Sequence, residues 1–342
     1  MTRRLKPEDQ ALCDAICGKL AAPGMAQRRA MAKVITLLES TRPDHRARAD
    51  AILNALLPKS GRSLRIGISG VPGAGKSTLI EALGLSLIDK GHRVAVLVID
   101  PSSSISGGSI LGDKTRMHRL SVHEGAYIRP TPSSGHLGGV AEKTREAILV
   151  AESAGHDIVI VETMGVGQSE SAVADMTDMF VLLHLPHAGD ELQAMKKGVM
   201  ELADLVVINK SDLDPIAAAN SKRQVSNAMQ GRGPHHEKHP LKHDDPIWQP
   251  KAITISALKG EGIPDLWDAM VSFHKTQLGN GQMDAKRKRQ NRAWMWDHIE
   301  AGLKQSFIEH PSVKTHFGLI QEAVDDGTLP ASVAARQLLN LL

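Results

Sequence analysis

Residues 70–77 read GVPGAGKS, which matches the pattern G-x-x-x-x-G-K-[ST] at every fixed position. An apolar stretch over residues 64–69 precedes the pattern, and a periodic helical stretch over residues 78–88 follows it. Strand, glycine-rich turn and helix in this order form a phosphate-binding loop. The feature predicts an α/β fold, a P-loop domain with a doubly wound, mostly parallel sheet that binds a nucleoside triphosphate.

The chemistry of this loop follows from its residue types. Glycines let the chain curl so that backbone N–H groups point at phosphate oxygens, and the helix N-terminus adds positive potential. We expect Lys76 to reach the β- and γ-phosphates and the Ser77 hydroxyl to ligate Mg²⁺. An ordinary glycine-rich turn with an exposed lysine is the disfavoured alternative. The predicted nucleotide-binding residues here are Gly73, Ala74, Gly75, Lys76, Ser77 and Thr78.

Acidic residues follow two further apolar stretches. Asp100 comes after residues 94–99, and Glu162 ends a β-branched run typical of the Walker B pattern. Because the carboxyl ends of parallel strands face the ligand crevice, both are predicted to contribute to the Mg²⁺ shell. For Asp100, the start of a proline-containing turn is an equally good interpretation. Asp113, in a Ser- and Gly-rich segment with the character of a switch loop, is a third metal candidate.

The segment that begins at Glu162 reads E-T-M-G, where GTPases usually read D-x-x-G. In Ras-like proteins a glutamine directly after this glycine orients the attacking water. Here Val166 follows Gly165. Valine cannot orient water, so we expect slow intrinsic hydrolysis unless Gln168 or a partner supplies the missing group.

Asn209, Lys210 and Asp212 form an N-K-x-D pattern after the apolar stretch 205–208. The Asp212 carboxylate can accept hydrogen bonds from guanine N1–H and the exocyclic amine, donors that adenine does not present there. Such buried hydrogen bonds can reject a mismatched ligand by about 10⁴-fold or more. A further apolar strand leads into a turn whose backbone is expected to meet the guanine carbonyl, formed by Ser256, Ala257 and Leu258. The predicted ligand is therefore GTP or GDP with Mg²⁺.

Helical patterns flank this domain. The predicted division is an N-terminal helical arm over 1–61, a GTPase domain over 62–280 and a C-terminal helical region over 281–342. The aliphatic residues near the C-terminus predict a dimer contact, since so much apolar surface must pack on something. The basic residues 286–289 are interpreted as a solvated helix start rather than a nucleic-acid patch.

Composition excludes several classes of protein. A net charge of +3 argues neither for nor against nucleic-acid binding, whereas an aromatic content of 3% disfavours base-stacking nucleic-acid platforms. The N-terminus lacks a secretory signal, and no apolar run is long enough to span a bilayer. Cys13 and Cys17 are interpreted as reduced apolar residues. We therefore predict a cytoplasmic protein that binds neither nucleic acid nor membrane.

Residues 235–243 contain four histidines. This density invites a metal-binding interpretation. We favour a polar surface loop, because no periodic element would fix the ligands.

The motifs together resemble the MeaB/ArgK family. The residues that carry the resemblance are Asp100-Pro101, GGSILGD at 107–113, ETMGVGQSE at 162–170 and GDELQ at 189–193. The family comprises GTPase chaperones of adenosylcobalamin-dependent methylmalonyl-CoA mutase and its relatives. The resemblance implies a homodimer with GTP and Mg²⁺, in complex with the mutase, that gates cofactor delivery from an adenosyltransferase.

The resemblance also implies roles for single residues. Residues 185–196 resemble the family's third switch, so Gln193 and Lys196 would take part in partner-stimulated hydrolysis beside Lys76 and Glu162. The sequence departs from the usual family residues at Ser134, Met164 and His187. Two other functions stay open, a nickel-type metallochaperone GTPase that uses the histidine-rich loop and a kinase linked to amino-acid transport.

Overall fold

The structure is a computed structural model that describes residues 5–18, 24–40, 42–100, 117–132, 137–163, 169–186, 197–229 and 246–342. The chain divides into two units, Met1–Arg287 and Lys288–Leu342. The predicted three-part division at residues 61 and 280 stays a prediction.

The first unit is built on a seven-stranded sheet in which all neighbouring strands run parallel, in the order β3-β2-β4-β1-β5-β6-β7. The strands are β1 (Leu64–Gly70), β2 (Val94–Asp100), β3 (Ala126–Pro132), β4 (Ile158–Thr163), β5 (Met179–His184), β6 (Leu205–Ile208) and β7 (Lys251–Thr254). After β1 the chain forms β2 and β3 on one side of the sheet and returns to place β4 between β2 and β1. It then adds β5, β6 and β7 on the other side of β1. The predicted α/β class with a doubly wound parallel sheet is confirmed.

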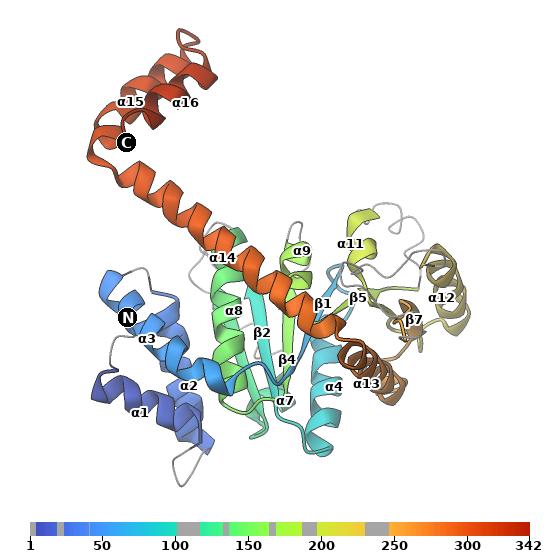
Figure 1. Ribbon diagram of the computed structural model, residues 1–342. Helices are drawn as coiled ribbons and strands as arrows, with labels where there is room; N and C mark the ends of the chain where they lie inside the picture. Colours follow the sequence, from blue (N-terminus) through green and yellow to red (C-terminus); the bar gives the residue numbers. More distant parts are fainter. Residues whose placement is uncertain are drawn as a thin grey trace. The chain divides into compact units, whose positions relative to one another are not determined.

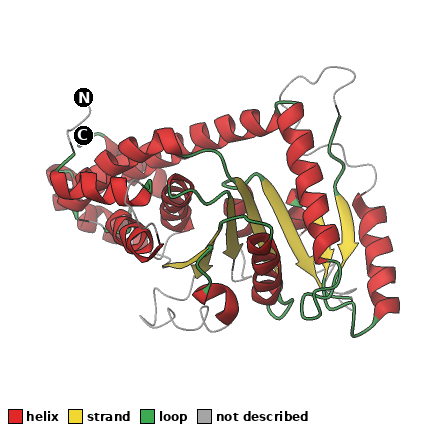
Figure 2. Ribbon diagram, turned by 90° about the horizontal axis from the view of Figure 1, so that it is seen from below, coloured by secondary structure: helices red, strands yellow, loops and turns green. Residues whose placement is uncertain are grey.

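Helices cover both faces of this sheet (Figures 1 and 2). They are α4 (Lys76–Asp89), α7 (His118–Val122), α8 (Leu137–Ser153), α9 (Ser169–Ala174), α11 (Lys197–Leu202), α12 (Pro215–Met229) and α13 (Ile263–Gly279). Strand β4 shows how the core divides. Val159 and Val161 face the apolar cluster that contains α8, whereas Ile158 and Ile160 face the cluster that contains α4 and α13. Strands buried on both faces read as continuous apolar runs, as β4 does.

Three N-terminal helices pack on the α8 face as a further layer, α1 (Pro7–Ile16), α2 (Gly24–Leu38) and α3 (Pro43–Leu56), followed by the short η1 (Leu57–Lys59). Prolines stand at the first turns of α1 and α3, where the absent N–H has no helical partner. The buried Gln27 amide donates to the carbonyls of Ile16 at 2.6 Å and Ala154 at 3.0 Å. Its oxygen accepts from Arg93 at 2.8 Å, so polar bonds as well as apolar contacts fasten the arm to the sheet domain.

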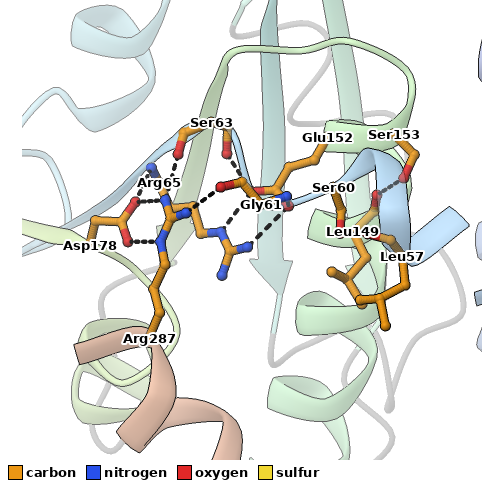
Figure 3. A network of polar contacts seen from close by, with 10 residues as sticks. All are labelled: Leu57, Ser60, Gly61, Ser63, Arg65, Leu149, Glu152, Ser153, Asp178 and Arg287. Atoms are coloured by element: carbon orange, nitrogen blue, oxygen red, sulfur yellow. Dashed lines mark hydrogen bonds and ion pairs between the residues drawn. The ribbon is translucent and has the colours of Figure 1, made fainter. Parts of the chain in front are cut away.

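A buried polar network lies at the amino edge of the sheet, where the strands begin (Figure 3). Helix α14 (Gln282–Glu309) brings Arg287 to this edge. Its guanidinium forms a bidentate pair with Asp178, Nε to Oδ1 at 2.7 Å and Nη2 to Oδ2 at 2.6 Å. It also donates to the carbonyls of Gly61 and Ser63, each at 2.6 Å. One side chain thus joins α14, the start of β5 and the segment that enters β1.

Glu152 of α8 completes the network from the other side. Its carboxylate accepts from the Gly61 N–H and the Ser63 hydroxyl, each at 2.6 Å. It also accepts from Arg65 Nε at 2.8 Å and Nη2 at 3.0 Å. The Arg65 N–H donates to Asp178 at 2.8 Å, so the two buried carboxylates are linked through one strand.

The prediction that residues 286–289 are solvated is wrong for two of them. Lys286 is buried and donates to the Asp178 carbonyl at 2.7 Å, and Arg287 pairs with the Asp178 carboxylate. The partner of both lies more than a hundred residues away in the sequence. A local charge pattern carries no signal of such a partner.

The second unit comprises the remainder of α14, α15 (Pro311–Asp325) and α16 (Ala331–Leu339). Val313, Ala334 and Leu338 are its buried apolar residues. Several large apolar side chains are exposed there, namely Met295, Trp296, Ile299, Leu303, Ile308, Phe317, Leu319, Leu339 and Leu342. In neither unit is a described helix long and apolar enough to cross a membrane.

Candidate nucleotide-binding site

The phosphate loop connects β1 to α4 at the carboxyl edge of the sheet. Gly75 directly precedes α4 with φ of 91°, a left-handed conformation that favours glycine. A Cβ there would lie 2.5 Å from Asn209 Nδ2. At Gly70, a Cβ would lie 2.5 Å from the Leu183 carbonyl oxygen. The two glycines are therefore required by the close approach of neighbouring strands and loops, and they let the loop curl ahead of the helix N-terminus.

Lys76 is the first residue of α4, and its side chain turns back over the loop. Its Nζ donates to the Gly70 carbonyl at 2.7 Å and to the Val71 carbonyl at 3.3 Å. The residue is buried. Backbone carbonyls are neutral acceptors, and a phosphate oxygen is a stronger, charged one. The ammonium is thus held in the loop by bonds that an anionic ligand can replace.

Ser77 and Glu162 bring two oxygen donors together beside the loop. The Ser77 hydroxyl donates to Glu162 Oε1 at 3.2 Å, and the Glu162 residue is 2% exposed. Hydroxyl and carboxylate oxygens are the donors that Mg²⁺ prefers. These two residues fit a magnesium site.

The other predicted residues of this region are only partly described. Asp100 ends β2 at the same edge of the sheet as Glu162, but its side chain lies outside the description. Asp113, Gln193 and Lys196 fall outside the described residues altogether. The same holds for Val166, Gln168 and the histidine-rich segment 235–243.

The N-K-x-D segment leaves the end of β6 and lies against both the phosphate loop and the S-A-L turn. Asn209 Nδ2 donates to the Ala74 carbonyl at 2.8 Å, and its Oδ1 accepts from the Ala257 N–H at 3.0 Å. The side chain therefore bridges two loops, a role that the N-K-x-D pattern in the sequence does not predict. Its two partners are distant in the sequence, so no local pattern could have pointed to them.

Lys210 is the non-glycine residue with positive φ in the described part of the chain, at 61°. Backbone strain of this kind clusters at ligand sites. Asp212 lies two residues further on, and a hydrogen bond from the Ser256 side chain lowers the pKa of its carboxyl group. An ionised Asp212 can accept two hydrogen bonds from one base edge. Leu258 at the end of the S-A-L turn is exposed, at 82%.

The predicted phosphate, metal and base residues that are described therefore meet at one edge of the sheet, at or just beyond the carboxyl ends of β1, β4, β6 and β7. The arrangement offers backbone N–H groups and an ammonium for phosphates, two oxygens for a divalent cation, and a carboxylate for a base that presents paired donors.

Comparison with known proteins gives matches along nearly the whole chain. The family described as "Methylmalonyl Co-A mutase-associated GTPase MeaB" matches residues 31–312. A Caulobacter vibrioides protein named "Putative GTPase" is 51% identical over 312 residues, covering 91% of this chain and 93% of that protein. A mouse protein, "Methylmalonic aciduria type A homolog, mitochondrial", is 45% identical over 349 residues, covering 99% of this chain and 81% of that protein.

Among solved structures, one titled "Crystal structure of LAO/AO transport system kinase" is 33% identical with a TM-score of 0.71, and the match covers 99% of each chain. The family match includes the phosphate loop, Glu162 near the end of β4 and the N-K-x-D segment.

Proposed function

The chain belongs to the MeaB family of methylmalonyl-CoA mutase-associated GTPases, and we propose that it serves as a GTP-dependent chaperone of a cobalamin-dependent acyl-CoA mutase. The protein is a GTPase that binds guanine nucleotides. The structural observation that supports the nucleotide site is the pair of hydrogen bonds of Asn209, which donates to the Ala74 carbonyl and accepts from the Ala257 N–H and so joins the phosphate loop to the base-reading turns. The chaperone role is supported by the family match.

In this proposal the residues at the carboxyl edge contact separate parts of the nucleotide and its metal ion. The loop N–H groups of residues 73–78 and the Lys76 ammonium hold the β- and γ-phosphates and neutralise charge that develops during transfer. Ser77 and Glu162 hold Mg²⁺, with Asp100 and Asp113 as further candidates. Mg²⁺, when bound, neutralises charge on the phosphate oxygens. Asp212 accepts from the guanine edge, which distinguishes GTP from ATP.

The client proposed for this GTPase is methylmalonyl-CoA mutase. The family description and the name of the mouse relative support this choice. Val166 stands where a water-orienting glutamine would accelerate hydrolysis, so a stimulated rate needs another group. We propose that Gln193 and Lys196 act in that stimulation when the mutase binds, and that hydrolysis gates cofactor transfer from an adenosyltransferase.

We further propose a homodimer formed through the second unit. The exposed apolar side chains of α14, α15 and α16 support it, with Trp296 at 57% and Leu303 at 65% exposure. Exposed apolar patches of this kind mark association surfaces. Light scattering of the intact protein should give twice the chain mass, and Leu303→Asp should shift it toward one chain mass. A wild-type protein of single chain mass at all concentrations would remove this part of the proposal.

The decisive experiment is GTP turnover of the purified protein, alone and with methylmalonyl-CoA mutase or related mutases. We expect slow turnover alone and a large rise with one mutase. Lys196→Ala should keep the basal rate and lose the rise, whereas Lys197→Ala is the neighbouring control. Indifference to every mutase would refute the chaperone role and would redirect tests to metal binding by residues 235–243 or to ATP-dependent kinase activity.

A further inference from the structure

Two buried hydroxyl groups meet where β4 and β1 end. Thr163 Oγ1 donates to Ser69 Oγ at 2.9 Å, and the two residues are 0% and 1% exposed. Thr163 directly follows Glu162, and Ser69 directly precedes Gly70, whose carbonyl accepts from Lys76. The bond therefore joins the strand that carries the proposed metal-binding carboxylate to the strand that carries the phosphate loop.

This bond extends strand pairing by one residue. The parallel register between β1 and β4 runs from Leu64↔Ile158 to Ile68↔Glu162. The next pair along the two strands is Ser69 and Thr163, and here the side chains make the contact. On its other side β4 pairs with β2 as far as Ile99↔Thr163, one residue before Asp100. Thr163 thus lies between the two strands that lead to the phosphate loop and to the second acidic candidate.

The carboxylate of Glu162 has to be fixed by its surroundings. A glutamate carboxylate lies one methylene farther from the backbone than that of an aspartate, and the additional torsion gives it more orientations. The Oε1 atom of Glu162 in β4 lies 3.2 Å from the Oγ atom of Ser77 in α4. Functional groups of this kind must be held to within about 0.5 Å by the residues around them. Without the hydrogen bond between Thr163 and Ser69, the end of β4 would be held to β1 only by the backbone pairing that ends at Ile68 and Glu162.

We infer that Thr163 is a positioning residue, whose hydrogen bond to Ser69 holds Glu162 in register with Ser77 so that both oxygens serve one divalent cation. The inference rests on the magnesium site of the proposed function. Thr163 acts through Glu162 and has no contact of its own with nucleotide in this role.

The test measures how strongly Mg²⁺ and nucleotide binding depend on each other. GDP carrying a fluorescent methylanthraniloyl group is titrated into the full-length protein, once with Mg²⁺ and once with EDTA. The dissociation constant measured in EDTA divided by that measured with Mg²⁺ reports the contribution of the metal site, and this quotient is called the Mg²⁺ ratio. Thr163→Val should lower this ratio about fivefold, the size of effect that one lost hydrogen bond gives. Ser69→Ala should lower it similarly, and Thr163→Ser, which keeps the hydroxyl, should restore it.

A matched control is available at the other edge of the sheet. Thr177 is also fully buried, and its hydroxyl donates to the Val173 carbonyl at 2.7 Å. Thr177→Val removes a comparable bond far from the nucleotide, so it should lower the melting temperature and leave the Mg²⁺ ratio unchanged. The double variant Ser69→Ala/Thr163→Val removes both partners and should lower the ratio no further than either single change, because the two residues share one bond.

A separate variant distinguishes failure of the inference from failure of the metal site. Glu162→Gln should lower the ratio more than Thr163→Val does. If Glu162→Gln lowers the ratio and Thr163→Val, Ser69→Ala and their double variant all leave it unchanged, the positioning role is refuted while the metal site stands. If Glu162→Gln also leaves it unchanged, the metal site itself is wrong. Should Thr163→Val fail to fold, Ser69→Ala decides by the same ratio.

Discussion

The two edges of the sheet use polar groups in opposite ways. At the carboxyl edge, Lys76 donates to the backbone carbonyls of Gly70 at 2.7 Å and Val71 at 3.3 Å, and Ser77 donates to Glu162 at 3.2 Å. At the amino edge, Asp178 and Glu152 each accept several charge-assisted bonds from arginines and backbone groups. The first set can be exchanged for ligand atoms, whereas the second is saturated. The comparison separates residues proposed to bind the nucleotide from residues that hold the fold.

The largest effect is expected for Asp212→Asn at the carboxyl edge. The amide places an N–H donor where the guanine exocyclic amine needs an acceptor, so guanine selectivity should fall by about 10⁴-fold. The affinity for xanthosine nucleotides, which carry a carbonyl at that position, should rise. Competition titrations with GDP and XDP measure both effects.

The control for this change is Asp214→Asn. Asp214 Oδ1 accepts from the Ala217 N–H at 2.9 Å at the start of α12, so the variant changes a nearby carboxylate without touching the predicted base contacts. If Asp212→Asn lowered the melting temperature as much as an amino-edge variant does, the distinction between nucleotide-binding residues at one edge and structural residues at the other would be contradicted.

Asp178→Ala should have the largest effect on stability. It removes the buried carboxylate that pairs with Arg287 and accepts from the Arg65 N–H, and loss of one partner of a buried pair costs about 3–5 kcal/mol of unfolding free energy. Urea denaturation measures this loss. Asp157→Ala is the control at the same edge, because its carboxylate is half exposed and pairs with His92 at the surface, where such pairs contribute about 0–1 kcal/mol. Equal losses in the two variants would contradict the role of burial.

The amino edge should also set the acid stability. Burial, followed by the charge of Arg93, lowers the pKa of His156 to about 4. The unfolded chain binds a proton at this residue near pH 6.5, so unfolding is favoured as the pH falls from about 6.5 to about 4, by up to about 1.4 kcal/mol per pH unit. His156→Gln should flatten this dependence in urea titrations. A wild-type curve that is already flat over this window would contradict the buried neutral histidine.

Asp178 should act at lower pH than His156. Burial alone would raise the pKa of its carboxyl group, but the bonds and charge of Arg287 and Arg65 lower it. Because the folded-state pKa is depressed, its stabilising contribution is complete above the ordinary value of about 3.9 and is lost below it.

Arg287→Lys should have the smallest effect. The charge remains near Asp178, but an ammonium cannot reproduce the bidentate pair together with bonds to Gly61 and Ser63. We expect a loss of about 1–2 kcal/mol in urea denaturation, the size of one or two hydrogen bonds. The matched change Arg289→Lys, two residues further along α14, should be neutral.

The sequence predicted what depends on local pattern. The strands over 64–69 and 205–208 and the helix after the phosphate loop lie where the apolar pattern of the sequence placed them. The predictions of a GTPase and of family membership are confirmed by the family match. The roles assigned to single site residues stay predictions, and those of Asp113, Gln193 and Lys196 fall on residues that the structure does not describe.

What escaped prediction depends on contacts between distant segments. The bonds of Arg287 to Asp178, of Asn209 to Ala74 and of Thr163 to Ser69 each join residues more than ninety positions apart. A threonine, an asparagine or an arginine in these segments looks like any other polar residue until the sheet order is known. Once such a side chain is buried between distant segments, the fold depends on its hydrogen bond.

The Arg287 network has a consequence for dividing this protein into parts. A fragment that ends near residue 280, where the sequence pattern places the end of the GTPase domain, would contain Asp178 and lose the guanidinium that neutralises it. A fragment that begins after Ser63 would lose the backbone carbonyls that accept from the same guanidinium. Gene fusions or excised domains cut at the boundary near residue 280 would therefore contain the buried Asp178 carboxylate without its arginine partner. The smallest GTPase fragment that keeps this network extends from before Gly61 to beyond Arg287.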